Sequence, residues 1–126
     1  MSKSLLLSAL CCLFFMSLAY ATFNTPAPVS INTNLMVRTP SVTTDQLIIF
    51  FGMYQNSPSE IDIYYATRTS KNQPFGSPIP VSSVNSSLME WGPDISANGL
   101  TLHFARGSSY NNGDIWVATR SSIFDP

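Results

Sequence analysis

Short runs of alternating apolar and polar residues follow one another along the chain after residue 21. Leu100–Phe104 places an apolar residue at every second position, which is the period of a strand with one buried face. Asp114–Thr119 is rich in β-branched and aromatic residues, which also favour strands. Ser96–Gly99 ends in Asn-Gly, a pair that accepts the positive φ of a tight turn. Because no helical period occurs after residue 21, we expect an all-β fold.

The strand pattern occurs twice along the chain. Asp62–Arg68 returns 52 residues later as Asp114–Arg120, with five of the seven positions identical. Phe23–Ser30 returns at the same offset as Phe75–Ser82, and both segments contain Phe, Pro-x-Pro, Val and Ser. Separate blocks that agree on one period indicate an internal repeat.

A third block places the strands within each period. Asn32–Phe51 returns 53 residues later as Asn85–Phe104. The drift of one residue falls in a loop, where insertions are well tolerated. We expect strands at about 38–43, 47–54, 61–68 and 75–82 in the first period, and at about 91–96, 100–106 and 114–120 in the second.

A period near 50 residues with four strands is typical of a β-propeller blade. Trp91–Phe104 resembles the WD40-like Pro-Asp repeat of TolB-type propellers, in which a proline-led strand precedes a Ser-x-Asp-Gly turn and a Leu-x-Phe strand. Asn98 stands where that family has Asp, and Asn112–Trp116 is similar to the family's Asp-Ile-Trp strand. The resemblance implies two four-stranded antiparallel blades, about 32–84 and 85–126, of which the second lacks its outer strand.

The phase of the repeat predicts an incomplete ring. Phe23–Ser30 has the sequence of an outer strand, and the second period contains three strands before Pro126. Propellers close with about four to eight blades. Two blades are therefore either a fragment of a longer propeller or one subunit of a homo-oligomer. Three copies would supply six blades and four copies eight, in a head-to-tail ring.

Residues 1–21 have the pattern of a secretory signal peptide. Lys3 precedes an apolar run, Leu5–Leu18, and small residues lead to a predicted cleavage site after Ala21. The run has 14 residues, whereas a membrane span requires roughly 20. We therefore expect a secreted or periplasmic protein without a membrane span after cleavage.

The low charge of the chain narrows the function classes. Charged residues make up 10% of the chain and the net charge is −1, whereas a soluble domain usually has about 25% charged residues. Such a surface does not favour nucleic acid, which is bound mainly through neutralised phosphates. Cys11 and Cys12, the two cysteines, both lie in the predicted signal peptide, so the mature chain, 22–126, has no disulfide or thiolate ligand. We expect no metal and no cofactor.

The residues give little support to catalysis. His103 is the one histidine and lies in a predicted strand, and no Gly-x-Ser-x-Gly elbow is present. Glu60, Glu90, Asp94 and Asp125 include carboxylates that a glycosidase pair would need, but the Ser-x-Asp-x-Gly-x-x-Trp box of sialidase-like propellers is absent. We therefore predict no enzyme and no catalytic residue.

Predicted loops on one face of the propeller are better suited to binding. Arg106–Gly113 combines Arg, Tyr, Ser, Asn and Gly, which is typical of adaptable recognition loops. Trp91 either stacks on a ligand or packs between the blades. The candidate ligand-binding residues are Tyr54, Trp91, Arg106, Tyr110 and Asn111.

These observations favour a non-enzymatic binding or scaffold module, for which the family resemblance implies contacts with a protein partner. Two alternatives stay open. One is a carbohydrate-binding propeller assembled from identical two-blade chains, in which Trp91 and Tyr110 stack on a sugar. The other is the propeller part of a secreted hydrolase.

Overall fold

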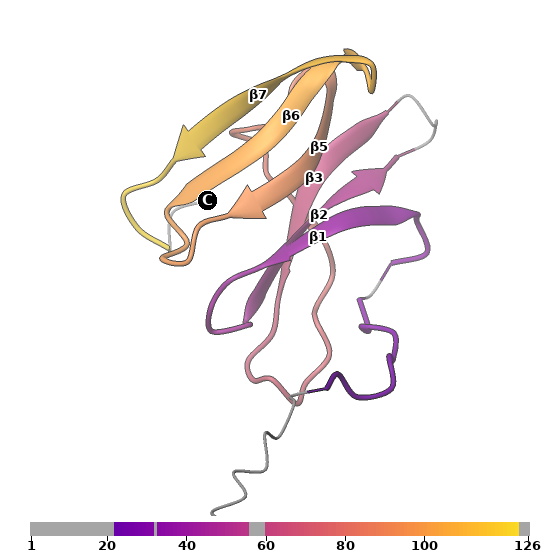
Figure 1. The fold of residues 1–126 in the computed structure, drawn as a ribbon, viewed down its shortest axis with the longest axis vertical. Coiled ribbons are helices and arrows are strands. Elements are labelled where there is room, and N and C mark those ends of the chain that lie inside the picture. Colours follow the sequence, from indigo (N-terminus) through magenta and orange to yellow (C-terminus); the bar gives the residue numbers. More distant parts are fainter. Residues whose placement is uncertain (1–21, 32, 56–59, 124–126) are drawn as a thin grey trace, which may run out of the picture.

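The computed structural model describes residues 22–31, 33–55 and 60–123 (Figure 1). The predicted signal peptide, 1–21, lies outside the described residues. The described residues form seven strands in two antiparallel sheets, of four and three strands, and include no helix. No helix that could cross a membrane is found among them. The prediction of an all-β fold is confirmed, and the two sheets do not close into a ring.

The first sheet has the strand order β1-β2-β3-β4. Its last strand is shorter than the predicted segment 75–82, because only Tyr64 and Tyr65 of β3 pair with it. Pro78 and Pro80 lack the backbone N–H that a longer ladder requires. The strands are β1 Val37–Val42, β2 Ile48–Tyr54, β3 Ile61–Thr67 and β4 Ile79–Pro80.

The second sheet has the strand order β5-β6-β7. Its strands are β5 Met89–Ile95, β6 Thr101–Ser109 and β7 Asn112–Thr119. The prediction that 106–113 form a loop is wrong, because β6 extends to Ser109 and β7 begins at Asn112. Strand pairing continues to a two-residue turn, because Gly107 faces Gly113 and the missing side chains let the two backbones approach closely. A Cβ on Gly107 would lie 1.9 Å from the carbonyl oxygen of Asn112.

The turn between β1 and β2 is held by its own side chains. The Asp45 Oδ1 atom accepts hydrogen bonds from the Thr43 hydroxyl, at 2.6 Å, and from the Leu47 N–H, at 3.0 Å. Gln46 has a φ of 61°, which a tight turn of this kind requires.

The turn between β5 and β6 repeats this arrangement 53 residues later. The Asn98 Oδ1 atom accepts hydrogen bonds from the Ser96 hydroxyl, at 2.7 Å, and from the Leu100 N–H, at 3.1 Å. Gly99 has a φ of 72°. The positive φ predicted for the Asn-Gly pair is confirmed at the glycine, and an amide takes the place of the Asp45 carboxylate.

β1 and β5 each contain a β-bulge at the equivalent position. Thr39 and Gly92 have positive φ, of 49° and 62°, and strand pairing changes register at both residues. A bulge increases the local twist and redirects the neighbouring side chain. The side chains next to these two bulges are those of Arg38 and Trp91.

Side chains of β1 and of the turn that follows it hold the first sheet against β5 and the turn after β5. The Ser41 hydroxyl oxygen accepts a hydrogen bond from the Ile95 N–H at 3.0 Å, and the Thr44 hydroxyl donates one to the Ala97 carbonyl at 2.8 Å. β1 and β5 therefore lie side by side, and the remaining strands lie farther out on each sheet (Figure 1).

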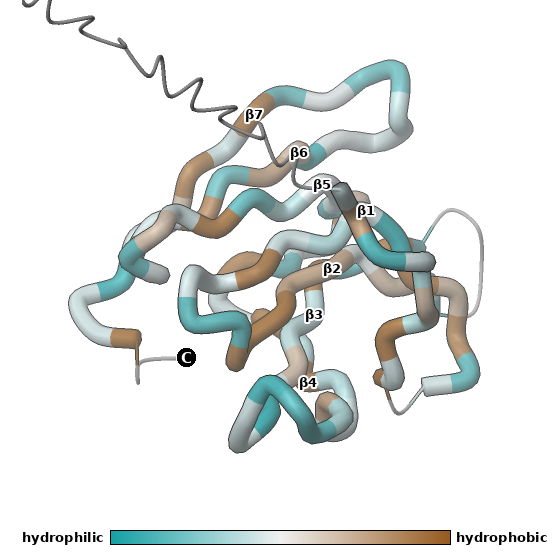
Figure 2. The backbone as a smooth tube through the Cα atoms, turned by 60° about the horizontal axis from the view of Figure 1, so that its bottom comes forward, coloured by the Kyte–Doolittle hydropathy of each residue, from teal (hydrophilic) through white to brown (hydrophobic). Residues whose placement is uncertain are grey.

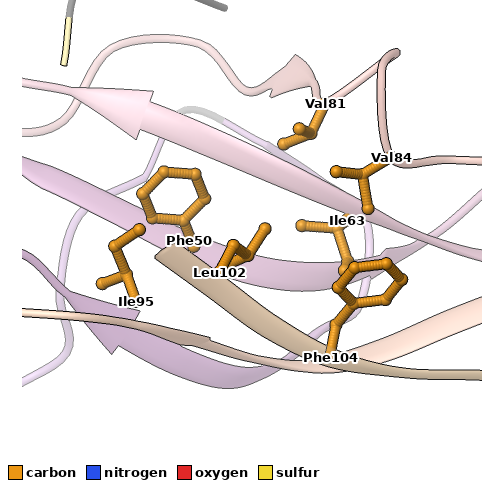
Figure 3. Close-up of a cluster of buried hydrophobic side chains, with 7 residues drawn as sticks. All are labelled: Phe50, Ile63, Val81, Val84, Ile95, Leu102 and Phe104. Atoms are coloured by element: carbon orange, nitrogen blue, oxygen red, sulfur yellow. The ribbon is translucent and has the colours of Figure 1, made fainter. Parts of the chain in front are cut away.

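The main core lies between the two sheets (Figure 3). It joins side chains from both sheets and from the segment that follows β4. A second cluster covers the opposite face of the first sheet, so β2 is buried on both faces. The main core comprises Phe50, Ile63, Val81, Val84, Ile95, Leu102 and Phe104.

The two ends of the described chain contrast with this core. Phe23–Ser30, predicted as an outer strand, forms no strand and is exposed throughout. β7 is the edge of the second sheet, and its side chains are exposed from Asn112 to Val117. Figure 2 nevertheless shows hydrophobic stretches in β7. Ile115 and Val117 of this strand are exposed apolar residues.

Candidate functional site

Four side chains from both sheets meet at one end of the strands. The hydroxyl oxygens of Tyr54 and Tyr110 lie 2.7 Å apart in a hydrogen bond. The rings of Trp91 and Tyr110 meet edge to face, with centroids 5.0 Å apart. The Arg38 guanidinium lies 5.0 Å from the Tyr54 ring centroid and 6.0 Å from that of Tyr110. We call Arg38, Tyr54, Trp91 and Tyr110 the aromatic surface.

Each member of the aromatic surface is placed by a defined backbone feature. Arg38 and Trp91 adjoin the two bulges, Tyr54 is the last residue of β2, and Tyr110 lies in the turn between β6 and β7. Gly113 makes room for Trp91, because a Cβ at this position would lie 2.5 Å from the Trp91 Cη2 atom. The surface therefore depends on both sheets and on the contact between them.

The aromatic surface combines apolar rings with polar groups that already interact with each other, namely the two tyrosine hydroxyls. Tyr110 is 42% exposed and Arg38 is exposed, so a partner can reach both. Partial burial, together with the hydrogen bond to Tyr54, raises the pKa of Tyr110 to about 12. The phenol is protonated over the whole physiological range, as a tyrosine of ordinary pKa also is, and the pair of hydroxyls has a proton to donate and lone pairs to accept.

Sequence reasoning predicted three of these four residues. The structure brings together the predicted residues Tyr54, Trp91 and Tyr110. Arg38 was not among the residues predicted from the sequence. The signal for Arg38 is its position 53 residues before Trp91, in the equivalent strand. Asn111, the fourth predicted residue, is the second residue of the exposed β6–β7 turn beside Tyr110.

Arg106, the fifth predicted residue, does not join the aromatic surface. Its Nε atom donates to the Glu90 carboxylate at 2.8 Å, and Glu90 is completely buried. Ser86 also donates to this carboxylate, through its N–H at 3.2 Å and through its hydroxyl. The Arg106 guanidinium donates to the Val84 carbonyl and lies 4.4 Å from the Trp116 ring centroid. These contacts tie the segment after β4 to the second sheet.

A cleft of about 430 Å³ lies at the opposite end of the strands. It continues the main core outward between the sheets, and Phe50, Tyr65 and Leu102 are among its lining residues. Asp45 and Arg120 stand among the polar residues that line it. In the part of the chain that the structure describes, no three His, Cys, Asp or Glu side chains gather to hold a metal ion.

The aromatic surface is thus the candidate site, with convergent side chains from both sheets of which Arg38 and Tyr110 are exposed and Tyr54 and Trp91 are half-buried. Comparisons of the chain with protein-family models, with curated proteins and with solved structures found no match. A function must therefore be inferred from the side chains themselves.

Proposed function

We propose that this chain is a non-enzymatic binding module of a secreted or periplasmic protein and that it holds a protein partner through the aromatic surface. The observation that carries this proposal is the convergence of Trp91, Tyr110, Tyr54 and Arg38 on one exposed patch. Trp, Tyr and Arg are the residue types enriched at the energetic centres of protein interfaces.

The pairing within the patch favours a protein over a carbohydrate. Stacking on a sugar is favoured by free aromatic faces, but the Arg38 guanidinium lies over the Tyr54 ring, and the Trp91 and Tyr110 rings are in contact with each other edge to face. Side chains that are already held in place lose little conformational entropy when a partner binds. A preorganised patch of this kind suits the side chains and backbone of a protein partner.

The same proposal includes the architecture, in which the two sheets are adjacent blades of a TolB-like propeller. Its support is the recurrence of the turn, the bulge and the strand sequence at offsets of 52 or 53 residues. The side-by-side placement of β1 and β5 also fits two blades around a common axis. The residues that support secretion, 1–21, lie outside the described residues.

A peptide selection tests the proposed partner class. The probe is a phage library of random peptides, which is selected on the purified chain, and a glycan array is tested in parallel. Peptides that bind the parent chain should lose at least tenfold in affinity with Trp91→Ala and with Tyr110→Ala. His103→Ala is the matched control, because His103 is an exposed β6 residue outside the patch.

The outcomes separate the candidate functions. Peptides that bind the parent chain and the His103 variant, but neither patch variant, support the proposal. Saturable glycan binding without peptide binding overturns it in favour of the carbohydrate alternative. Peptides that bind all variants equally overturn the assignment of the site, and thermal unfolding of each variant identifies any that has lost its fold.

A further inference from the structure

We propose that the aromatic surface binds a carboxylate of its protein partner, with the Arg38 guanidinium as the charged donor and the tyrosine hydroxyls as neutral donors beside it. This inference rests on the proposed function, because it names the group that a partner brings to the same surface. It adds a charge requirement that aromatic contacts alone do not impose. The carboxylate belongs either to an Asp or Glu side chain or to the end of a peptide chain.

The position of Arg38 is set by the pairing of β1 with β2. Arg38 lies opposite Gly52, which stands midway between Phe50 and Tyr54 on β2. Because alternate residues of a strand share a face, Arg38 and Tyr54 lie on the same face of the first sheet as Phe50. Phe50 belongs to the main core between the two sheets. Arg38 is therefore on the face that packs against the second sheet, where its aromatic neighbours come from both sheets.

Arg38 is exposed and has no carboxylate partner among the described residues, in which Arg106 and Glu90 form the single ion pair. Arg68 and Arg120 are held by the chain itself, because the Nε atom of each donates to a backbone carbonyl. A guanidinium carries five N–H donors in a planar fork, which matches the two oxygens of a carboxylate. The charge of Arg38 is thus available to a group outside the described chain.

Two aromatic rings hold this guanidinium beside the tyrosine hydroxyls. It lies 5.0 Å from the Tyr54 ring centroid and 6.0 Å from that of Tyr110. Burial raises the pKa of Tyr110 most, and Arg38 acts on this pKa in the opposite direction, as a positive charge close to a phenol does. Because contact with the rings limits the conformations of the long arginine side chain, less entropy is lost when a partner binds.

The two tyrosine hydroxyls add a neutral donor to the charged one. They share one hydrogen bond between Tyr54 and Tyr110, so one of their two protons lies between the oxygens and the other can be donated to an external acceptor. An ionised carboxylate only accepts hydrogen bonds and has two oxygens to accept them. It can therefore accept from the guanidinium and from a hydroxyl together.

The charge of the aromatic surface favours a single negative charge on the partner. Arg38 is its one charged member, and the other three members are neutral aromatic residues. Phosphorylated motifs are usually bound by clusters of arginines, which this surface lacks. A cationic group would be repelled by Arg38. A carboxylate matches both the charge and the donors of the surface, and its apolar neighbours in a peptide can contact the rings.

Two phage libraries of random peptides, selected on the purified chain, test the inference. One library displays peptides with a free carboxyl terminus. The other displays peptides with a free amino terminus, in which only Asp and Glu side chains supply carboxylates. Binders from the second library should be enriched in Asp or Glu, or binders from the first should require their terminal carboxylate. The library that gives such binders identifies the source of the carboxylate.

A double-mutant comparison then assigns the carboxylate to Arg38. Arg38→Gln should lower the affinity for a selected acidic peptide at least tenfold. The same peptide with an amide in place of the carboxylate should bind the parent chain and the Arg38 variant equally. Lys71→Gln is the matched control, because it removes an equal charge from an exposed residue that acts on Asp45, at the opposite end of the strands. Thermal unfolding checks that each variant keeps its fold.

The outcomes separate this inference from the proposed function. Peptides that bind through Trp91 and Tyr110, but without acidic enrichment and without a loss in Arg38→Gln, overturn the inference and leave the proposed function standing. Equal losses in Arg38→Gln and Lys71→Gln overturn it as well, because the effect would then be one of net charge. A phosphoserine peptide that binds more tightly than its Asp equivalent overturns the choice of a carboxylate. Failure of all peptides to bind overturns the proposed function and this inference together.

Discussion

The hydroxyl groups of Tyr54 and Tyr110 form a hydrogen bond between the two sheets. Their hydroxyl oxygens lie 2.7 Å apart although the residues are 56 positions apart in the chain. The hydrogen bond forms only when the two sheets place the members of the aromatic surface correctly. The pKa of Tyr110 shows whether the bond is present.

Replacing Tyr54 by Phe should lower the pKa of Tyr110 from about 12 toward its ordinary value near 10. Burial raises this pKa most and would remain, whereas the hydrogen bond with Tyr54, which favours the protonated Tyr110, and the charge of ionised Tyr54 would be lost. The measurement is a pH titration by NMR of chains labelled with ¹³C at the tyrosine ring.

Tyr110→Phe identifies the resonance, because the signal that titrates last should disappear from its spectrum. The raised pKa also predicts that folding stability falls as pH rises from about 10 to about 12, since the unfolded chain ionises first. A Tyr110 titration unchanged by Tyr54→Phe would show that the hydrogen bond is not formed in solution.

Asp45→Asn should remove part of the acid sensitivity of folding. Hydrogen bonds from Thr43 and Leu47 lower the pKa of Asp45 below 3.8, so its contribution is complete above about pH 4 and is lost as pH falls through the lowered value. Asn98 makes the same bonds in the second turn without titrating. Urea unfolding between pH 2 and 6 should therefore show a flatter pH profile for the variant, with similar stability near pH 6.

At the scale of the strand, glycines decide where side chains can pack. Gly113→Ala should destabilise the fold by about 1–3 kcal/mol, because the new methyl group would overlap the Trp91 ring. The movement of Trp91 should also shift its fluorescence emission. Gly76→Ala is the matched control, because its Cβ would have ordinary contacts, the nearest at 3.6 Å. Equal losses in the two variants would contradict the assigned packing.

The buried ion pair between Glu90 and Arg106 links β5 to β6. Arg106→Met should destabilise the fold by about 3–5 kcal/mol, because it leaves the Glu90 carboxylate buried without its counter-charge. Glu90→Gln in the same chain should recover part of the loss, since a neutral amide costs less to bury than a carboxylate. Urea unfolding of the single and double variants measures both effects, and additive losses would argue against a direct pair.

At the scale of the whole molecule, the core between the sheets holds the two halves together. Phe50→Ala should destabilise the fold by about 3–5 kcal/mol, because Phe50 is buried where side chains of both sheets meet (Figure 3). Leu88→Ala should change stability by no more than about 0.5 kcal/mol, because Leu88 is 46% exposed. Two separate unfolding transitions would show that the sheets fold independently.

Much of the architecture was predictable from short stretches of sequence. Alternation at Leu100–Phe104 and the Asn-Gly pair before it predicted β6 and its turn, and the structure confirms both. The prediction of a loop after Arg106 was wrong. The segment has the polar composition of a loop, but Gly107 and Gly113 face each other and let the two strands continue to pair. Turn composition alone does not reveal which residues face each other across a hairpin.

The sequence by itself determined the all-β fold, the order of the strands and the tight turns, because alternation, β propensity and Asx turns depend on residues a few positions apart. Only the tertiary structure decided that Arg38 joins the aromatic surface and that Arg106 pairs with Glu90. The first outcome depends on a bulge and on the packing of the two sheets, and the second on the register in which β5 pairs with β6. The local pattern carries no information about strand register or about which residues of the two sheets meet.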